Sequence, residues 1–429
     1  MTTPRGRPYA ALRTPLQNES GVQSNNGSTG PERNSTSPPY PWRLPLDSAH
    51  RENCSDRRSL ESIQQLESGN SFNNRIYFVT VNSGEQYVLK VNGRFFGAEK
   101  IQNEVCCLNV LQRWCPYIPS PRVVAWSEDG LTVATHKEEP ICIDDNTAPA
   151  SPGWILMTRV PGDPVSSLTL SSQDMASIGM QLANLIATWR SDIPTMPYCG
   201  NLVFRSGAAD IDLAIHSNYD RVSIRGLVDG DIRLADPIST SLQLQEVRLR
   251  AKLADLETNE TYAPNRLVGP LVMKFMRETL PRLFRETTLS DPRFVFTSYD
   301  LAPRNVLITR LSDNEPPKIT GIVDFEFAGF FPAVEEFVND FVNNGGDWPG
   351  PIYTSYLDRL QELGVGTPRK GIEQSVWKRE HLLGRLLDDI APWWLPGPFD
   401  GDELADKLAE CRGVVESTIR ELEAMASSP

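Results

Sequence analysis

The 429-residue sequence lacks any long apolar run. No stretch of about 18 consecutive apolar residues occurs, so the sequence predicts no membrane-spanning helix. The amino-terminal segment has no apolar core of the kind found in secretory signals, and we therefore expect a cytoplasmic protein. The seven cysteines and four histidines are scattered and form no Cys-x-x-Cys pair, which argues against a structural zinc site.

Positive charge is also scarce. The chain has 42 Lys and Arg residues against 55 Asp and Glu residues, a formal net charge of -13. So acidic a protein has little general affinity for nucleic-acid phosphates, and we expect no nucleic-acid partner. With 40% apolar and 23% charged residues, the composition is otherwise that of an ordinary globular protein.

The composition changes twice along the chain. Residues 1–57 are rich in Ser, Asn, Pro and Gly and are predicted to form a disordered tail. Residues 58–160 combine β-type patterns with one helical pattern, whereas residues 161–429 are mainly helical in pattern. We therefore expect an α+β, bilobal fold, with a small β-rich amino-terminal lobe, a larger helical lobe and a cleft between them.

Hydrophobic periodicity predicts the individual elements. Residues 76–91 are typical of a β-hairpin with its turn at residues 82–84, and residues 98–115 have apolar side chains at helical spacing. Further short strands are expected at residues 123–126, 131–135, 154–157, 294–296, 306–309 and 319–323. Helices are expected at residues 172–190, 241–257 and 265–287, and within residues 333–425.

Three polar side chains lie next to the short apolar strands of residues 294–327. Asp300 follows one strand, Asn305 comes five residues later, and Asp324 ends a second strand. If residues 306–309 and 319–323 form a hairpin, all three side chains meet at one end of a small sheet. Oxygen ligands of this kind suit Mg²⁺, and a neighbouring carboxylate can accept a proton from an attacking hydroxyl. Taken singly, each residue could also be an ordinary turn or strand-end residue.

Two motifs here resemble the aminoglycoside phosphotransferase/choline kinase family. They are DLAPRNVL at residues 300–307 and IVDFEFAG at residues 322–329, which fit the family patterns HGDLxxxN and DWExAxxG in the same order. The resemblance covers about residues 60–429 and implies a protein-kinase-like fold. It also implies that Asp300 is the catalytic residue and that Asn305 and Asp324 hold Mg²⁺.

The resemblance further implies how the small lobe binds nucleotide. Lys90 matches the strand lysine that pairs with nucleotide phosphates, and Glu104 matches the helix glutamate that holds this lysine. Glu99 is the alternative partner for the lysine. Without the resemblance, Lys90 reads as a solvent-facing edge lysine and Glu104 as a solvated helix residue.

Two further segments complete the implied ATP site. Gly69, Asn70 and Ser71 occupy the place of the loop that covers the phosphates, although this loop contains a single glycine. The backbone of Met157 to Arg159 occupies the place of the segment that binds adenine. Glu326, which follows Asp324 by two residues, is interpreted as a structural residue that orients the metal-binding loop.

The sequence departs from the family pattern just before the catalytic position. Ser298-Tyr299 stands where the family has His-Gly, and this histidine braces the loop by hydrogen bonding. A second departure is the absence of the Gly-Asp-Pro that often follows the second motif; residues 329–332 read Gly-Phe-Phe-Pro instead. The loss of His-Gly, together with the glycine-poor loop around residues 69–71, keeps open a catalytically silent, kinase-fold protein that binds a nucleotide or a partner.

The sequence therefore predicts an ATP- and Mg²⁺-dependent kinase that phosphorylates a hydroxyl group of a small molecule. A protein kinase is disfavoured, because the motif is Asp-Phe-Glu rather than Asp-Phe-Gly and no Ala-Pro-Glu follows it. The sequence does not identify the acceptor.

Overall fold

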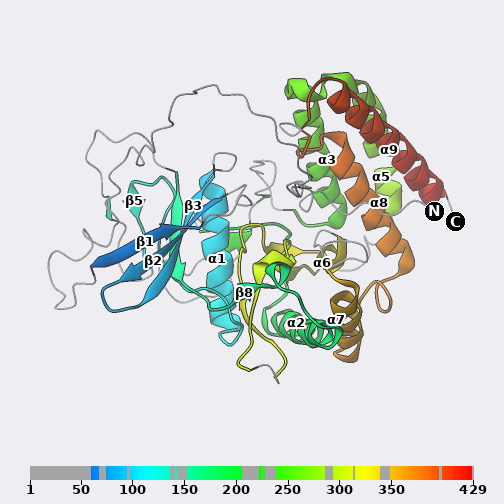
Figure 1. Ribbon diagram of the computed structural model, residues 1–429. Coiled ribbons are helices and arrows are strands. Elements are labelled where there is room, and N and C mark those ends of the chain that lie inside the picture. Colours follow the sequence, from blue (N-terminus) through cyan, green and yellow to red (C-terminus); the bar gives the residue numbers. More distant parts are fainter. Residues whose placement is uncertain are drawn as a thin grey trace, which may run out of the picture.

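The computed structural model describes residues 59–66, 74–93, 97–135, 141–142, 152–204, 222–224, 226–227, 238–285, 293–312, 315–338, 348–395 and 399–427. Within these residues the chain forms a small lobe built on a β-sheet and a larger lobe built mainly from helices (Figure 1). The expected α+β, bilobal architecture is thus confirmed. The tail predicted for residues 1–57 lies outside the described residues, as do Gly69, Asn70 and Ser71.

The small lobe contains a five-stranded antiparallel sheet in the order β1-β2-β3-β7-β4. The strands are β1 (Leu60–Gln65), β2 (Asn74–Val81), β3 (Gln86–Asn92), β4 (Val123–Ser127) and β7 (Trp154–Thr158). Gly84, at the predicted hairpin turn between β2 and β3, has a φ of 81°, which glycine adopts without strain. Strand β1 was not predicted, because all six of its residues are exposed and no apolar alternation marks it.

Helix α1 (Ala98–Trp114) lies beside this sheet and agrees with the helix predicted over residues 98–115. Two very short strands, β5 (Thr132–Val133) and β6 (Ile141–Cys142), pair with each other at the periphery of the lobe. The sheet has its own apolar cluster, which includes Val79, Val81 and Leu156. The buried side of α1 instead belongs to the large core that continues into the helical lobe.

The larger lobe has two groups of helices. Helix α2 (Ser172–Asp192) packs along α7 (Gly350–Glu362), and a Ser171–Asp174 capping box fixes the start of α2. The second group, at the upper right of Figure 1, surrounds a separate apolar cluster. Its helices are α3 (Ser241–Thr258), α4 (Gly269–Glu278), α5 (Leu280–Leu283), α8 (Gln374–Ile390) and α9 (Gly401–Ser427).

The prediction of one continuous helix over residues 265–287 is wrong. The chain there forms a 3₁₀ helix at Glu260–Val268, followed by α4 and then by the single turn α5. Pro270 and Pro281 stand in the first turns of α4 and α5. Proline has no N–H to donate to the preceding turn, so it begins a new helix and does not continue the earlier one.

Small sheets connect the two lobes. Strands β12 (Val306–Thr309) and β13 (Lys318–Ile322) form the predicted hairpin, and β8 (Asp163–Pro164) adds to its edge. Strand β11 (Val295–Thr297) pairs with β14 (Gly329–Phe331). Strand β14, the short α6 (Glu335–Val338) and the pair β9 (Leu202–Phe204) and β10 (Val222–Ile224) complete this region.

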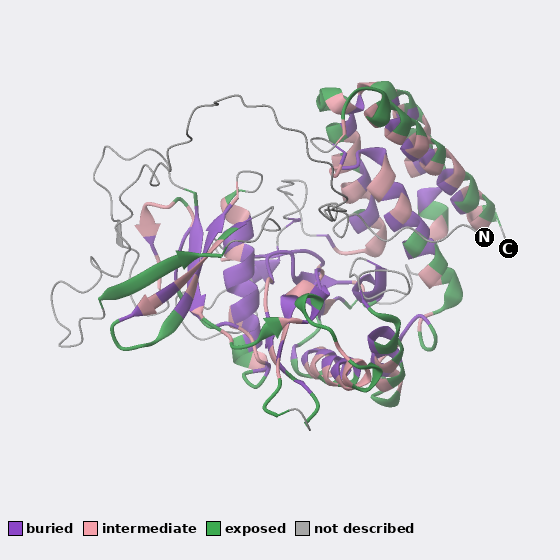
Figure 2. Ribbon diagram, viewed as in Figure 1, coloured by how far each residue is buried: buried purple, intermediate pink, exposed green. Residues whose placement is uncertain are grey.

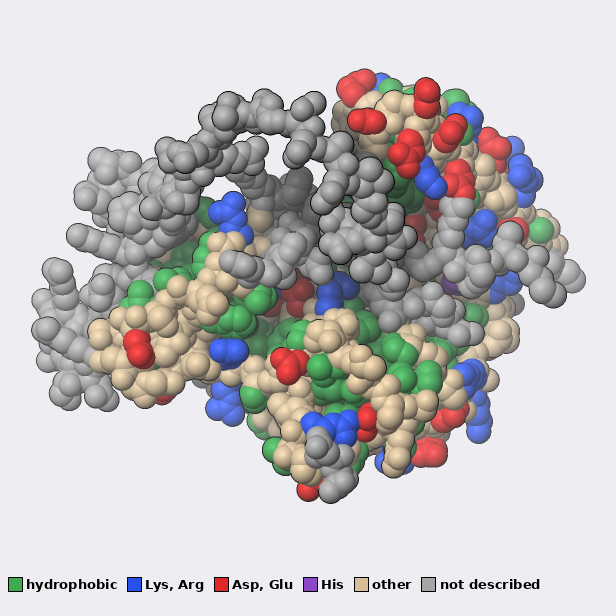
Figure 3. Space-filling model, viewed as in Figure 1, with side chains coloured by type: hydrophobic (Ala, Val, Ile, Leu, Met, Phe, Trp, Pro, Cys, Tyr) green, Lys and Arg blue, Asp and Glu red, His purple; other side chains and the backbone are tan. Residues whose placement is uncertain are grey.

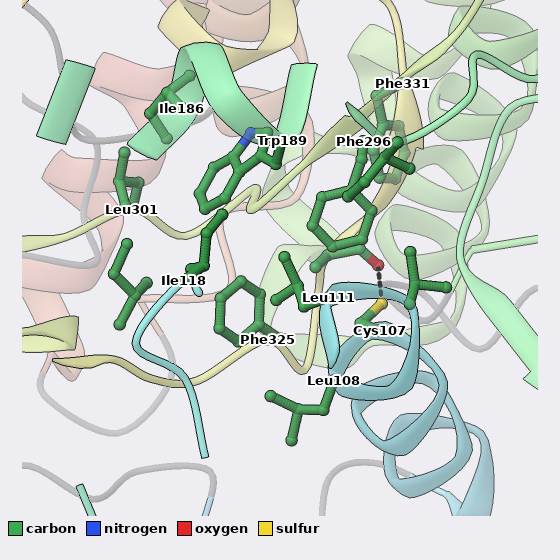
Figure 4. Packing of buried hydrophobic residues seen from close by; sticks show 14 of the residues in the cluster. Cys107, Leu108, Leu111, Ile118, Ile186, Trp189, Phe296, Leu301, Phe325 and Phe331 are labelled. Atoms are coloured by element: carbon green, nitrogen blue, oxygen red, sulfur yellow. Dashed lines mark hydrogen bonds between the residues drawn. The ribbon is translucent and has the colours of Figure 1, made fainter. Parts of the chain in front are cut away.

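The main core fills the space between α1, α2 and these small sheets, where Figure 2 shows continuous burial. Trp189 of α2 meets Phe296 and Phe325 edge-on, with ring centroids 6.0 and 6.4 Å apart (Figure 4). These aromatic contacts hold β11 and the segment that follows β13 against α2, next to the polar motifs. Among the described residues, no helix has the length and apolarity needed to cross a membrane.

Candidate active site

Lys90 lies in the middle of β3 with its side chain buried. Its Nζ is 2.7 Å from Glu104 Oε2 on α1, 2.5 Å from Asp324 Oδ1 and 2.7 Å from Glu326 Oε2. Burial lowers the pKa of this ammonium group, but the three carboxylates outweigh that effect and hold its pKa well above the ordinary value. Lys90 is therefore a fixed positive charge and not a solvent-facing edge lysine.

A second buried lysine, Lys100, was missed by the sequence analysis. Its Nζ donates to Asn74 Oδ1 at 2.8 Å and lies 3.3 Å from Glu326 Oε2. Asn74 also donates to Glu326, at 2.7 Å. The sequence did hold a signal, because Lys100 precedes Glu104 by four residues and therefore lies on the same face of α1. Lys90, Lys100, Glu104, Asp324 and Glu326 are referred to below as the lysine cluster.

Glu326 holds the lysine cluster together. Burial raises the pKa of its carboxyl, but Lys90 and Lys100 outweigh burial and lower that pKa to about 2. The carboxylate is thus ionised at any physiological pH. The structural role that the sequence suggested for Glu326 has a concrete form: its carboxylate contacts both lysines and Asn74.

Asp300, Asn305 and Asp324 come together as the predicted hairpin requires. Asn305 Nδ2 donates to the backbone oxygen of Asp300 at 2.9 Å and to its carboxylate at 3.1 Å. The Val323 N–H donates to the Asn305 backbone oxygen at 2.9 Å, which places Asp324 directly beside this loop. Residues 298–305 are referred to below as the Asp300 loop.

Arg304 is a residue of the Asp300 loop that the sequence analysis did not single out. Its Nη2 lies 2.8 Å from both carboxylate oxygens of Asp300. Burial raises the pKa of Asp300 to about 7, and the nearby Asp324 and Glu326 contribute to the rise, whereas Arg304 opposes it. A carboxylate with such a pKa is suited to accept a proton near neutral pH.

Two residues of the site have a left-handed backbone. The φ angles are 66° at Tyr299 and 69° at Asp324, a region that residues other than glycine seldom occupy. Strain of this kind is found most often at functional sites, where surrounding contacts maintain it. At Asp324, the contact with Lys90 is one such constraint.

The carboxylates of Glu104, Asp324 and Glu326 lie close enough to one another to form a metal-binding group. In this structure they converge on the Lys90 ammonium, so their charge is already partly balanced. Asp324 is the most exposed of the three, at 27% of its side chain, against 3% for Glu104 and 2% for Glu326. Figure 3 shows acidic and basic side chains close together in the hollow between the lobes.

The segment expected to bind adenine lies at the end of β7. The Thr158 N–H donates to the Arg122 backbone oxygen at 2.9 Å, and the Arg159 N–H donates to the Gln86 backbone oxygen at 3.2 Å. The Arg159 guanidinium stacks over the Phe78 ring, 4.2 Å from its centroid. Met157 is buried within the sheet. Two of the backbone donors in this segment therefore already have acceptors inside the lobe.

Asn103, also missed by the sequence analysis, fastens α1 to the site. Its Nδ2 donates to the backbone oxygens of Glu326 at 2.8 Å and Ala328 at 2.9 Å, and its Oδ1 accepts from the Leu202 N–H at 2.7 Å. All three partners are backbone groups of the larger lobe. An asparagine in the middle of a helix gives no recognisable sequence signal for such contacts, because its partners lie 99 to 225 residues away.

Comparison with known proteins identifies the family. No curated protein matches the sequence. Among solved structures, the chain is similar to the ADP-bound aminoglycoside phosphotransferase APH(2'')-Ib. The two sequences are 12% identical, and the TM-score is 0.49. The match covers 84% of this chain and 95% of that chain. It is also similar to an ethanolamine kinase of Plasmodium vivax, with 11% identity and a TM-score of 0.47. That match covers 88% of this chain and 87% of the ethanolamine kinase.

The sequence match to a family model is more direct. The model of the phosphotransferase enzyme family matches residues 62–370, which span the lysine cluster and the Asp300 loop as well as most of both lobes. The chain therefore belongs to the phosphotransferase enzyme family.

Proposed function

We propose that the protein transfers the γ-phosphoryl group of ATP, with Mg²⁺, to a hydroxyl group of a small molecule. The observation that carries this proposal is the convergence of three distant segments on one site. Lys90 contacts Asp324, 234 residues away, and Asp324 directly follows the residue that pairs with Asn305. Asn305 in turn binds Asp300.

The lysine cluster supports a nucleotide-binding role. A buried, permanently charged ammonium group offers a fixed positive charge to the phosphates of ATP. Glu104, the first of the two candidate partners, keeps Lys90 in place through a 2.7 Å ion pair. Gly69, Asn70 and Ser71 remain proposed phosphate contacts, and the backbone of Met157 to Arg159 a proposed adenine contact.

The oxygen donors present fit Mg²⁺. Asp324 offers a partly exposed carboxylate, and Asn305 uses its amide nitrogen for Asp300, which leaves the amide oxygen as the coordinating atom. The bound ion would neutralise phosphate charge during the transfer.

Asp300 is the proposed proton acceptor. The acceptor hydroxyl oxygen would form a bond to the γ-phosphorus, the bond from that phosphorus to the β–γ bridging oxygen would break, and ADP would leave. The hydroxyl proton would pass to the Asp300 carboxylate. Arg304 and Asn305 hold this carboxylate from both sides, so it is already oriented before the substrate binds.

A small-molecule acceptor is favoured over a protein acceptor by the second motif. The sequence Asp324-Phe325-Glu326 places a glutamate where protein kinases have glycine, and here that glutamate is buried between two lysines. The Ala-Pro-Glu motif of protein kinases is absent from the sequence.

The first test is the thermal stability of the protein with and without ATP and Mg²⁺. A ligand at about 100 times its dissociation constant adds about 2.7 kcal/mol to the free energy of unfolding. We expect this gain in the wild type, dependent on Mg²⁺, and its loss in Asp324→Asn. Asparagine is the right replacement because it tolerates the left-handed backbone of residue 324 better than alanine does.

The matched control is Asp358→Asn, which removes an exposed carboxylate of α7 that pairs with Arg369, beyond the end of this helix. It should keep the full gain. If the folded wild type shows no gain with ATP and Mg²⁺, the proposed function is wrong and a silent kinase-fold protein takes its place.

A further inference from the structure

Tyr299 occupies a position where the backbone would favour glycine. With a φ of 66°, its backbone is left-handed, a conformation that is unfavourable for a residue with a side chain. The matching residue in the family pattern is the glycine of the His-Gly pair, and glycine adopts this conformation without strain. Such a cost persists where the side chain makes compensating contacts.

The Tyr299 side chain makes contacts of this kind. Its hydroxyl accepts a hydrogen bond from Arg248 Nη2 at 2.6 Å. Its ring packs against Phe331 of β14, with centroids 4.7 Å apart, and the Arg248 guanidinium lies 5.5 Å from the centre of the same ring. Tyr299 is thus held at its ring and at its hydroxyl.

Arg248 is itself firmly placed. It belongs to α3, its side chain is only 11% exposed, and it forms a two-pronged ion pair with Glu335 of α6, with N–O distances of 2.8 and 3.3 Å. Glu335 is buried. A charged pair removed from water in this way resists rearrangement, because breaking it would leave a buried charge unpaired.

The chain of contacts therefore runs from α6 through Arg248 to Tyr299, the residue immediately before Asp300. Helix α3 also joins two parts of the larger lobe, since Leu244 packs in the main core and Leu249 in the cluster of the second helix group. The position of the Asp300 loop is thereby tied to two helices that are remote in sequence.

We propose that Tyr299 and Arg248 are positioning residues that hold the Asp300 carboxylate toward the acceptor, in place of the missing His-Gly pair. This inference rests on the proposed function. Tyr299 is the residue of the loop that is held, through its hydrogen bond to Arg248. Arg248 is in turn held in the larger lobe by its ion pair with Glu335.

The test compares four variants by ADP release from MgATP, with water as the acceptor. Tyr299→Phe removes only the hydroxyl, and Tyr299→Gly removes the side chain while suiting the backbone. We expect each to lower kcat about 10- to 100-fold with little change in KM for MgATP, because misplacement of a reacting group costs rate and not nucleotide binding. Arg248→Lys, which cannot reach both partners in the same fork geometry, should lower kcat similarly.

The fourth variant restores the family pair. Ser298→His combined with Tyr299→Gly should recover most of the kcat lost in Tyr299→Gly alone, a rescue that simple loss of packing would not show. Tyr262→Phe is the matched control. It also removes one buried tyrosine hydroxyl, which donates a hydrogen bond to the Pro392 backbone oxygen and makes no contact with the Asp300 loop in the described residues. Its kcat should equal that of the wild type.

Hydrogen exchange of residues 298–305 provides a readout that needs no turnover. Exchange in this segment should be faster in Tyr299→Phe than in the wild type and unchanged in Tyr262→Phe. Equal exchange and equal kcat in wild type and Tyr299→Phe would overturn the inference. If the wild type instead binds MgATP but releases no ADP above the Asp300→Asn blank, the proposed function fails, and hydrogen exchange still decides whether this contact holds the loop.

Discussion

The lysine cluster and the Asp300 loop form two halves of one site, but they are built from different kinds of contact. The ion pairs of the lysine cluster join residues 14 and 234 positions apart, and the side chains are nearly all buried. The Asp300 carboxylate is held by Arg304 and Asn305, four and five positions away, and it follows Tyr299, whose backbone is left-handed.

The difference separates two tasks. The lysine cluster forms only when both lobes are folded together, so its integrity reports on the whole fold. The Asp300 loop owes its shape to local contacts and to a few remote ones. Among the remote ones are the Arg248 hydrogen bond to Tyr299 and the Trp348 Nε1–H that donates to the Leu301 backbone oxygen at 2.7 Å. Substitutions in the cluster should therefore change stability and nucleotide binding, whereas substitutions in the loop should change turnover.

The largest effect is expected for Asp300→Asn. The amide keeps the shape of the side chain but cannot accept the hydroxyl proton, so turnover should fall about 10²- to 10⁴-fold. The thermal gain with MgATP should persist. Steady-state rates and thermal unfolding of the same preparations provide the measurement, and undiminished turnover would remove Asp300 from the proposed role.

Lys90→Met should produce the reverse pattern. It leaves Glu104 buried without its cation and Glu326 with Lys100 as its remaining lysine. We expect a loss of about 3–5 kcal/mol in the free energy of unfolding, measured by chemical denaturation. The MgATP gain should vanish as well.

The double variant Lys90→Met with Glu104→Gln separates the two effects of this substitution. Removing the unpaired Glu104 charge should restore part of the free energy of unfolding. It should restore none of the nucleotide binding. Recovery of both together would show that Lys90 acts on nucleotide binding only through the fold.

The smallest effect concerns pH. Because the Asp300 pKa is raised to about 7, kcat should fall as the pH drops below about 7, where the carboxyl takes up a proton. Arg304 lowers this pKa, so Arg304→Gln should move the acid limb of the rate profile upward by about one unit. The same shift makes the folded protein lose stability as the pH rises between about 4 and about 7, since the unfolded chain ionises this carboxyl more readily.

Arg310→Gln is the control for the pH profile. Arg310 pairs with Asp174 and has a side-chain exposure of 34%, close to the 37% of Arg304, but it lies outside the Asp300 loop. Its profile should match that of the wild type. A profile that is flat from pH 8 to well below 6 would contradict the raised pKa of Asp300.

The sequence allowed prediction of those parts of the site that lie in short, contiguous motifs. Asp300 and Asn305 are five residues apart, and the β12–β13 hairpin that brings Asp324 beside them follows from apolar alternation and a turn. The contact of Glu104 with Lys90 followed from a resemblance, not from spacing, because nothing local distinguishes Glu104 from Glu99.

The residues that escaped prediction act through partners far away in the sequence. Lys100 and Asn103 lie on an ordinary amphipathic helix, and only the folded chain shows that their partners are Asn74, Glu326 and the backbone of β9. Arg248 lies in a helix of mixed polarity. Its role depends on the folded positions of its two partners, Glu335 of α6 and Tyr299. Local patterns cannot reveal such contacts.

The three hydrogen bonds of Asn103 have a mechanical consequence. They fasten α1 to the backbone of the larger lobe, and α1 packs into a core that also contains Trp126 and Ile155 of the sheet. Since α1, one face of the sheet and the larger lobe share this core, α1 couples the movements of the two lobes. The ion pair between Lys90 and Glu104, which joins the sheet to α1, should therefore keep nearly the same length when the site opens or closes.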